Sequence, residues 1–334
     1  MEVAKGTVLG SSLQVPSVYE MAKEKIAAVP SRYVRYNQEL VLSSSSSALE
    51  VPVIDMEILL DGDVMDTELK KLHHTCKEWG FFQLINHGVS YSLLEKVKTE
   101  VDEFFKLPLE EKRKFGQLDG DVERYGQAFV MSNEQKLDWA DMLFMITLPT
   151  ELRKPHLLPQ LPLSFSVMAK ALKMNPEELE VLFEEGMQSM RMNYYPPCPQ
   201  PDQVIGLTPH SDGTGLTILY QLNETEGLQV RKDGIWIPVK PLPSGFVVNI
   251  GDILEVITNG TYPSIEHRGI VNSVKERMSV ATFLAPNLQG DFGPAPSLLS
   301  PETPNYKRIN TMDFLQGFFA QKLDGKSYLD TLRI

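Results

Sequence analysis

A histidine and an aspartate stand two residues apart in the segment TPHSDGTG, at His210 and Asp212. We predict that this segment enters a β-strand, where residues i and i+2 project from the same face. An imidazole nitrogen beside a carboxylate oxygen supplies two of the three ligands of a 2-His-1-carboxylate metal site. Taken alone the pair is a weak signal, because a surface turn explains it as well.

The third ligand must come from elsewhere in the chain, and His267 in SIEHRGIV is the best candidate among the six histidines. It lies late in the same β-patterned region, on a strand of its own. The remaining histidines fall on a predicted helix, a turn and a loop, where we expect structural or exposed side chains: His73, His74, His87 and His156. Taken singly, His267 fits a hydrogen-bonded sheet histidine at least as well as a ligand.

Two further pairs of polar residues follow the same i, i+2 spacing. In ERMSVATF, Arg277 and Ser279 point the same way, with Phe283 on that face by parity. The planar fork of an arginine suits a carboxylate, and a serine adds one donor. In RMNYYPP the same rule places Asn193 with Tyr195. Repeated polar pairs in one apolar β region favour a binding site, although a surface ion pair of Arg277 is the alternative.

Three protein ligands leave three positions open on a six-coordinate iron. A bidentate α-keto acid fills two of them and O2 fills the third. Thiolate-bound metals are disfavoured, because neither Cys76 nor Cys198 lies near these histidines in sequence. A four-coordinate hydrolytic zinc site would not need the arginine and serine.

Composition excludes several classes of partner. The 334 residues carry a formal charge of -12 without a basic block, which argues against nucleic acid or an anionic membrane. Two cysteines fit unpaired thiols in a reducing compartment. We find no signal peptide and no membrane span, and we therefore expect a cytoplasmic protein, a monomer that acts on a small molecule.

The pattern of apolar residues predicts a mainly β protein with flanking helices. Residues 1–186 form a helical and mixed region, residues 187–290 a catalytic core of short strands, and residues 291–334 a helical extension. Helices are predicted at 66–79, from a capping box of Ser92 and Glu95, at 165–173, from Asn175 to about Gly186, and at 311–323. Strands are predicted at VPVIDM, FFQLI, residues 143–147, MRMNYY, GLTILYQL, GLQV, IWIPV, GFVVNI, ILEVIT, SIEHRGIV and RMSVATFL.

Several stretches of the sequence resemble a known family. The stretches NYYPPCPQPDQVIGLTPHSDGTGLTIL, GDILEVITNGTYPSIEHR and ERMSVATF resemble plant 2-oxoglutarate/Fe(II)-dependent dioxygenases. CKEWGFFQLINHGV, LDWADMLFMITLP and the tail KLDGKSYLDTLRI are similar to the branch of SRG1-like proteins and opium-poppy alkaloid O-demethylases. Members of this branch hydroxylate, demethylate or desaturate specialised metabolites, and the resemblance covers nearly the whole chain.

The resemblance implies a double-stranded β-helix (jelly-roll) core that binds Fe(II) through His210, Asp212 and His267. It implies that 2-oxoglutarate is the co-substrate, with ascorbate as reductant. Arg277 and Ser279, helped by Tyr195 and with Asn193 nearby, would hold its distal carboxylate. The residues so implied are His210, Asp212, His267, Arg277, Ser279, Tyr195 and Asn193.

The sequence departs from the family pattern in three places. A long helix that the family carries between Leu163 and Ala169 is largely missing, either through a true deletion or because part of the natural chain is absent from this sequence. Pro263 replaces a basic residue or histidine ahead of the His267 strand, where it would remove a ladder donor, and Gly269 replaces the usual alanine.

We expect an oxygenase that hydroxylates or O-demethylates a small plant metabolite (an alkaloid, flavonoid or other phenolic) and releases succinate and CO2. Candidates for the substrate wall were chosen for apolar character near the motifs, and ordinary core is the alternative for each: Phe129, Met131, Leu143, Met145, Tyr220 and Phe283. Two other functions stay open, an ascorbate-using oxidase of the same fold that lacks 2-oxoglutarate and a non-catalytic ligand-binding relative.

Overall fold

The computed structural model describes residues 9–24, 26–35, 49–61, 65–118, 121–149, 152, 181–299 and 303–334. Two β-sheets dominate it, one of eight strands and one of four. The prediction of a mainly β protein with flanking helices is confirmed. The helix predicted at 165–173, most of the one predicted from residue 175, and the deletion expected at 163–169 fall outside the described residues.

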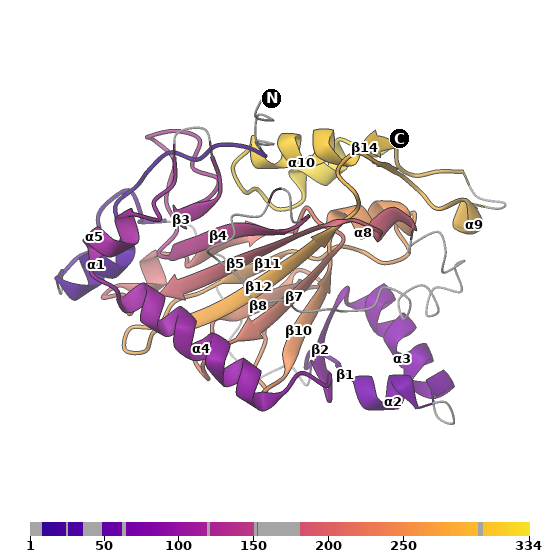
Figure 1. Ribbon diagram of the computed structural model, residues 1–334, viewed down its shortest axis with the longest axis horizontal. Helices are drawn as coiled ribbons and strands as arrows, with labels where there is room; N and C mark the ends of the chain where they lie inside the picture. Colours follow the sequence, from indigo (N-terminus) through magenta and orange to yellow (C-terminus); the bar gives the residue numbers. More distant parts are fainter. Residues whose placement is uncertain are drawn as a thin grey trace.

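The large sheet joins strands from both halves of the chain. In spatial order it consists of β1 (Val53–Asp55), β2 (Phe81–Ile85), β10 (Phe246–Ile250), β7 (Leu216–Gln221), β12 (Arg277–Ala285), β5 (Met187–Tyr195), β4 (Asp141–Leu148) and β3 (Arg124–Gly126). β1 and β2 pair in parallel, and every other neighbouring pair is antiparallel. The region before residue 186 thus extends the sheet of the predicted core on both sides (Figure 1).

The small sheet has the order β6 (Leu207–His210), β11 (His267–Gly269), β8 (Leu228–Lys232) and β9 (Ile235–Pro238). The hairpin from β8 to β9 turns at Asp233 and Gly234, whose φ angles of 52° and 79° suit an Asp-Gly turn. The two sheets enclose an elongated cavity between them. This arrangement is the double-stranded β-helix, or jelly-roll, that the family resemblance implied.

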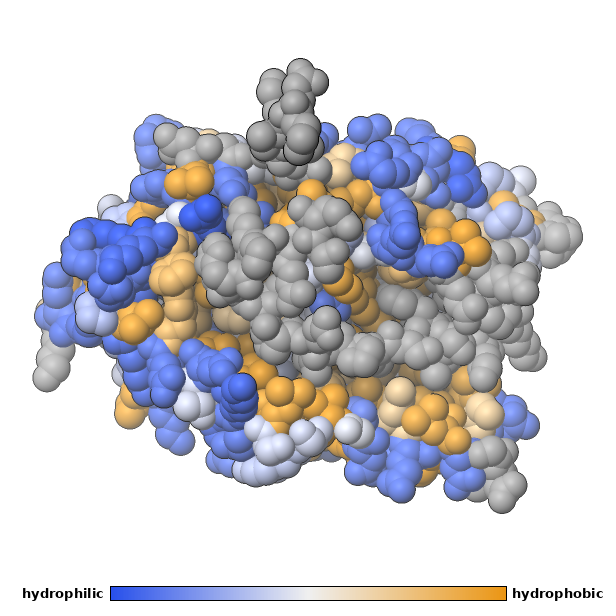
Figure 2. All heavy atoms as spheres, in the orientation of Figure 1, coloured by the Kyte–Doolittle hydropathy of each residue, from blue (hydrophilic) through white to orange (hydrophobic). Residues whose placement is uncertain are grey.

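Helix α4 (Tyr91–Lys106) covers the outer face of the large sheet (Figure 1). Its apolar side buries Leu94, Val101 and Phe105. Figure 2 shows that the residues at the left edge of this view, over α1 and α5, are mostly hydrophilic. Helix α4 begins two residues earlier than predicted, because the side chain of Ser90, and not that of Ser92, accepts the hydrogen bond from the amide of Leu93.

The other helices pack around the edges of the two sheets. They are α1 (Val18–Lys23), α2 (Met56–Leu60), α3 (Met65–Glu78), α5 (Leu109–Arg113), α8 (Asp252–Ile257), α9 (Pro296–Leu299), α10 (Thr311–Phe319) and α11 (Ser327–Asp330). A 3-10 turn, η2 (Pro201–Gln203), and a ribbon of β13 (Asp291–Phe292) and β14 (Ile309–Asn310) complete the described elements. Within these ranges no helix combines the length and apolar composition of a membrane span.

Two predictions about local structure were wrong. The run ILEVIT forms helix α8 and not a strand; all six residues of that helix are buried, and periodicity does not separate a buried helix from a buried strand. Pro263 lies before β11 and outside any strand, so it removes no ladder bond. Its carbonyl oxygen instead lies 2.1 Å from where a Cβ of Gly80 would stand, and Gly80 has a φ of +57°.

Candidate active site

The cavity between the two sheets gathers most of the chemistry-bearing residues that the sequence predicted. Its lining comprises Phe81, Ala128, Phe129, Phe144, Met187, Ser189, Arg191, Asn193, Tyr195, Leu207, His210, Asp212, Gly213, Thr214, Thr217, Leu219, Leu228, Asn249, His267, Gly269, Arg277, Ser279, Ala281, Phe283, Leu315, Phe318 and Phe319. Polar groups converge at two separate places in this mostly apolar wall.

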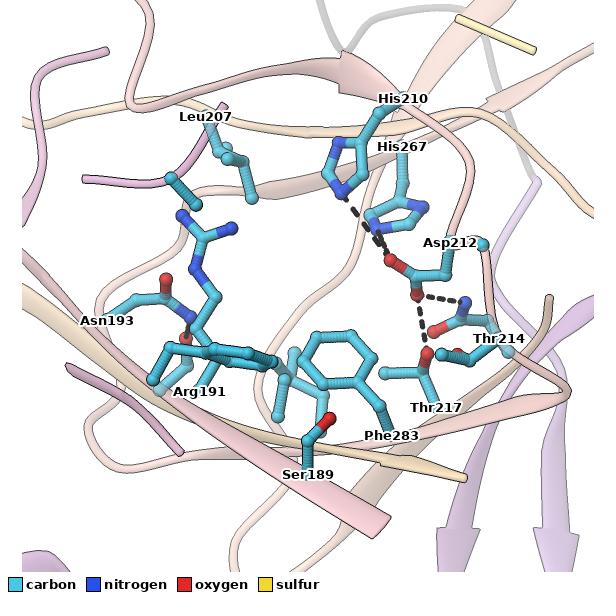
Figure 3. A pocket seen from close by; sticks show the side chains of 18 of the residues that line it. Ser189, Arg191, Asn193, Leu207, His210, Asp212, Thr214, Thr217, His267 and Phe283 are labelled. Carbon is cyan, nitrogen blue, oxygen red and sulfur yellow. Dashed lines mark hydrogen bonds and ion pairs between the residues drawn. The ribbon is translucent and has the colours of Figure 1, made fainter. Parts of the chain in front are cut away.

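At the first place His210, Asp212 and His267 converge, and their ligand atoms lie within 4.8 Å of one another (Figure 3). The Oδ1 atom of Asp212 is 3.5 Å from Nε2 of His210 and 3.7 Å from Nε2 of His267. β6 and β11 are neighbours in the small sheet, and their register pairs His210 directly with His267. Cross-strand pairing therefore brings together two residues that are far apart in the sequence.

His210 and Asp212 were predicted at the start of a strand, but they lie where a strand ends. β6 ends at His210, and Asp212 lies in the turn that follows. Two glycines let this turn pack closely against its neighbours. In the turn itself, a Cβ on Gly213 would lie 2.7 Å from the ring of Phe318. At the start of α8, a Cβ on Gly251 would lie 2.0 Å from the carbonyl oxygen of Thr214. Dense packing, and not strand alternation, thus places Asp212 beside His210.

Hydrogen bonds orient all three side chains. The Nδ1 atoms of His210 and His267 lie 2.7 and 3.2 Å from the carbonyl oxygens of Thr208 and Ile265, which leaves each Nε2 lone pair facing Asp212. Thr217 and Asn249 donate to Oδ2 of Asp212 at 2.6 and 2.8 Å: Thr217 through its hydroxyl, Asn249 through its amide. The donor set and its orientation fit a divalent first-row metal such as Fe(II).

The electrostatics favour the charge states that a metal requires. Burial lowers the pKa of His267 to about 4, and Asp212 opposes this shift. Burial alone would raise the pKa of Asp212, but His267, His210 and Asn249 hold it below the usual range. At neutral pH the site therefore offers a neutral imidazole at His267 and a charged carboxylate.

At the second place β5 and β12 carry the remaining predicted polar pairs side by side. Their register sets Arg277 opposite Tyr195 and Ser279 opposite Asn193. The Arg277 guanidinium is buried, lies 5.1 Å from the centre of the Tyr195 ring, and donates to Oε1 of Gln221 at 3.3 Å. Its Nε has no hydrogen-bond partner among the described residues.

Burial lowers the pKa of Arg277, with Tyr195 opposing, yet an arginine stays charged in a protein. A buried cation with an unused donor, beside a hydroxyl at Ser279, fits the carboxylate of a small ligand. The amide of Asn193 donates weakly to Ser279 Oγ at 3.5 Å, and Asn193 Oδ1 has no partner among the described residues. This second place therefore fits one carboxylate of a ligand such as 2-oxoglutarate.

Arg191 also lines the cavity, and sequence reasoning missed it. It precedes Asn193 by two residues on β5, so the parity that selected Asn193 and Tyr195 would have found it. Its Nε is buried without a partner in the described part of the chain, and burial lowers its pKa. Figure 3 shows Arg191 and Asn193 across the cavity from the three metal-ligand candidates.

Two of the six residues predicted for the substrate wall line the cavity, and a third lies in the pocket next to it. Phe129 and Phe283 line the cavity, and Met131 lines a neighbouring pocket that shares Ala128 and Phe129 with it. Leu143, Met145 and Tyr220 lie on the outer face of the large sheet, toward α4. The assignment of these three residues was wrong because apolar character does not indicate which face of a strand turns inward.

The roof of the cavity comes from α10, which the sequence analysis did not connect with the site. Leu315, Phe318 and Phe319 line the cavity from this helix. The ring of Phe129 stacks on Phe319, with centroids 5.3 Å apart, and meets Phe318 edge to face at 5.7 Å. Aromatic side chains of α10 and Phe129 thus close one part of the cavity.

A jelly-roll that carries two histidines and an aspartate beside a buried arginine defines a mononuclear non-haem iron oxygenase of the 2-oxoglutarate-dependent class. Sequence comparison agrees. The model of the 2OG-Fe(II) oxygenase superfamily matches residues 186–286, and that of the non-haem dioxygenase N-terminal region in morphine synthesis matches residues 51–161. The chain belongs to the 2OG-Fe(II) oxygenase superfamily.

Several characterised plant proteins are similar along their whole length. The chain is 54% identical to oxoglutarate-dependent flavonoid 7-O-demethylase 1 of Ocimum basilicum, covering 100% of this chain and 95% of the relative. It is 55% identical to protein SRG1 of Arabidopsis thaliana (99% of each chain) and 50% identical to thebaine 6-O-demethylase of Papaver somniferum (100% of each). The resemblance to this branch is confirmed.

A solved structure is similar as well. The crystal structure of JOX2 in complex with 2OG, Fe and JA has a TM-score of 0.85 and 32% identity, over 96% of this chain and 98% of that one. The Ocimum alignment spans 353 positions against the 334 residues of this chain, so that relative carries residues that this chain lacks. The deletion near 163–169 would account for such residues and stays a prediction.

Proposed function

We propose that this enzyme oxidises one C–H bond of a small plant specialised metabolite, by hydroxylation or O-demethylation, while 2-oxoglutarate is converted to succinate and CO2. The observation that carries the proposal is the convergence of His210, Asp212 and His267 on one side of a cavity, with Arg277 buried on the other. Relatives named as flavonoid, thebaine and codeine O-demethylases support O-demethylation as the first reaction to test.

The proposal gives each polar residue a task. His210, Asp212 and His267 hold Fe(II), and Thr217 and Asn249 keep Asp212 in place. Arg277 and Ser279 bind the distal carboxylate of 2-oxoglutarate, with Tyr195 and Asn193 beside them. When bound, the iron and 2-oxoglutarate supply an oxidant strong enough to break a C–H bond. The residues that carry these roles are His210, Asp212, His267, Arg277, Ser279, Tyr195 and Asn193.

The apolar wall orients the substrate and keeps water from the oxidising centre. Phe129, Phe283, Phe318 and Phe319 give the cavity flat aromatic surfaces that suit a ring system. Water would divert a reactive oxidant into side reactions, so this closure protects the turnover. Met131 lines the neighbouring pocket, which shares Ala128 and Phe129 with the cavity.

Arg191 narrows the expected substrate. A guanidinium that lines an apolar cavity, and whose Nε has no hydrogen-bond partner in the described chain, can recognise an acceptor, such as a phenolate, a carboxylate or a carbonyl oxygen. We therefore expect the preferred substrate to carry such an oxygen on the opposite side of the molecule from the oxidised carbon.

Incubation with Fe(II), 2-oxoglutarate, ascorbate and a panel of methylated flavonoids and alkaloids tests this function. Each O-demethylation converts one O–CH3 group to OH and releases formaldehyde together with succinate and CO2, whereas hydroxylation releases succinate and CO2 without formaldehyde. A His210→Ala variant is the control. Succinate no higher than in that control, for every compound, would support the non-catalytic relative; product formed with ascorbate but without 2-oxoglutarate would support the ascorbate-using oxidase.

We further propose a cytoplasmic monomer without nucleic acid or membrane partners, consistent with the charge of -12. We also propose the division into a 1–186 region, a 187–290 catalytic core and a 291–334 extension. Gel filtration with light scattering tests the monomer directly. A dimer at micromolar concentration would contradict it.

A further inference from the structure

The tail KLDGKSYLDTLRI lies directly behind the metal site, although none of its residues lines the cavity. The amide of Ser211 donates to the carbonyl of Gly325 at 3.2 Å, and the amide of Gly325 donates to the carbonyl of Pro209 at 3.2 Å. Gly325 thereby forms a parallel bridge with His210. The segment that carries two metal ligands is thus paired with β11 on one side and with the tail on the other.

One buried carboxylate holds the tail in this position. Glu255 on α8 is 3% exposed and accepts hydrogen bonds from four donors. These are Nζ of Lys326 at 2.6 Å, the hydroxyl of Tyr306 at 2.6 Å, Nη2 of Arg333 at 3.2 Å and the amide of Ser264 at 2.6 Å. Lys326 is bound twice, since it also donates to the carbonyl of Ser264 at 2.7 Å.

The helix that carries Glu255 also holds the metal-ligand turn. At the start of α8 the amide of Asp252 donates to the carbonyl of Asp212 at 2.7 Å, and the amide of Ile253 donates to that of Thr214 at 3.2 Å. One side of α8 therefore fixes the turn of Asp212, while Glu255 fixes the tail that braces His210. The two supports meet in a single short helix.

We propose that Glu255 is a positioning residue for the metal. Its contact with Lys326 keeps Gly325 paired with the strand of His210, and this pairing sets the geometry of the ligands. The inference rests on the proposed function, because it assumes that His210, Asp212 and His267 bind the metal. Groups outside the ligand shell commonly change metal affinity by about 10- to 100-fold. A role confined to stability would lower the melting temperature and leave metal affinity unchanged.

Titration of the metal-free protein with Co(II), followed by its visible absorption well below the melting temperature, separates these roles. We expect Glu255→Gln to raise the Kd by about tenfold and Lys326→Met to raise it by about threefold to tenfold. Lys322→Met, at an exposed lysine four residues earlier, is the matched control and should bind Co(II) as the wild type does.

A second pair of variants does not depend on the charge network. Gly325 has a φ of +54°, so Gly325→Ala strains the backbone that pairs with His210. Gly234 has a φ of +79° in the β8–β9 turn, where an added Cβ meets nothing within 4 Å, so Gly234→Ala strains a turn away from the metal. We expect a higher Kd for Gly325→Ala and an unchanged Kd for Gly234→Ala. If Glu255→Gln does not fold, this pair of variants tests whether the pairing of the tail with the strand of His210 sets the metal affinity.

Suppose that the wild type binds one Co(II) and that the Kd stays within about twofold of the wild-type value in all three variants, Glu255→Gln, Lys326→Met and Gly325→Ala. This result would overturn the inference and leave the proposed function intact. Failure of the wild type to bind Co(II) would instead overturn the proposed function, and the inference with it.

Discussion

The two polar ends of the cavity differ in how far the protein itself completes them. At the proposed metal end the orienting atoms are satisfied: Oδ2 of Asp212 receives two hydrogen bonds, and Nδ1 of His210 and of His267 faces a carbonyl oxygen. At the other end Nε of Arg277 and Arg191 have no partner among the described residues. The metal end is preorganised, whereas the other end is left for ligands to complete, which matches a bound metal and an exchanging co-substrate.

Removal of a proposed metal ligand should have the largest effect on activity, because it disrupts the preorganised metal end of the cavity. In Asp212→Ala we expect succinate formation to fall by more than about 100-fold, because loss of a ligand should exceed the loss caused by outer-shell changes. Metal content after dialysis against Fe(II) checks the cause. Retention of one iron per chain with normal turnover would show that Asp212 is not a ligand.

A substitution of Arg277 tests the other end of the cavity, where 2-oxoglutarate is proposed to bind. In Arg277→Lys the charge remains but the bidentate geometry is lost, so we expect the KM for 2-oxoglutarate to rise by about 10- to 100-fold. Arg231→Lys on the outer face of the small sheet is the control, since Arg231 pairs with Glu266 away from the cavity. Equal KM values in the two variants would remove Arg277 from the co-substrate site.

A subtler change tests whether hydrogen bonds hold the metal end in order. Thr217→Val keeps the shape of the side chain and removes the donor to Oδ2 of Asp212. We expect metal affinity to fall by about tenfold with little change in the KM for 2-oxoglutarate. A rise in that KM at unchanged metal affinity would mean that the two ends are not separate.

The smallest expected effect concerns pH. His267 has a folded pKa of about 4 against about 6.5 when unfolded, so the unfolded chain binds the extra proton. The stability that neutral His267 contributes is full above about pH 6.5 and is lost as the pH falls toward 4. The metal-free protein should lose about 1 kcal/mol of this contribution between pH 7.5 and 6. Urea unfolding of wild type and His267→Asn measures it; identical pH slopes would contradict the prediction.

Sequence alone predicted every strand of the large sheet except β3. It also predicted the inward parity of β5 and β12, because polar side chains at i and i+2 on buried strands stand out. The phase of β4 and β7 could not be predicted in this way. Cross-strand register decides it: Met142 lies opposite Asn193 and Phe144 opposite Arg191, which turns Leu143 and Met145 outward. Strand pairing between distant segments fixes such facts, and a single sequence does not show it.

His210, Asp212 and His267 come together as the sequence predicted, but for a partly different reason. Strand alternation was expected to align His210 with Asp212, whereas β6 ends at His210 and a glycine-containing turn carries Asp212. The roof was missed for a related reason. The apolar face of α10 is visible in the sequence, but the surface on which it packs is not.

Anaerobic titration of the Fe(II)-loaded protein with 2-oxoglutarate tests the central claim most directly, because chelation of Fe(II) by a 2-oxo acid gives a visible charge-transfer band. The account predicts a band that saturates at one 2-oxoglutarate per chain, weakens in affinity in Arg277→Lys, and is absent from His210→Ala. A band that persists in His210→Ala, or no band in the wild type, would contradict it.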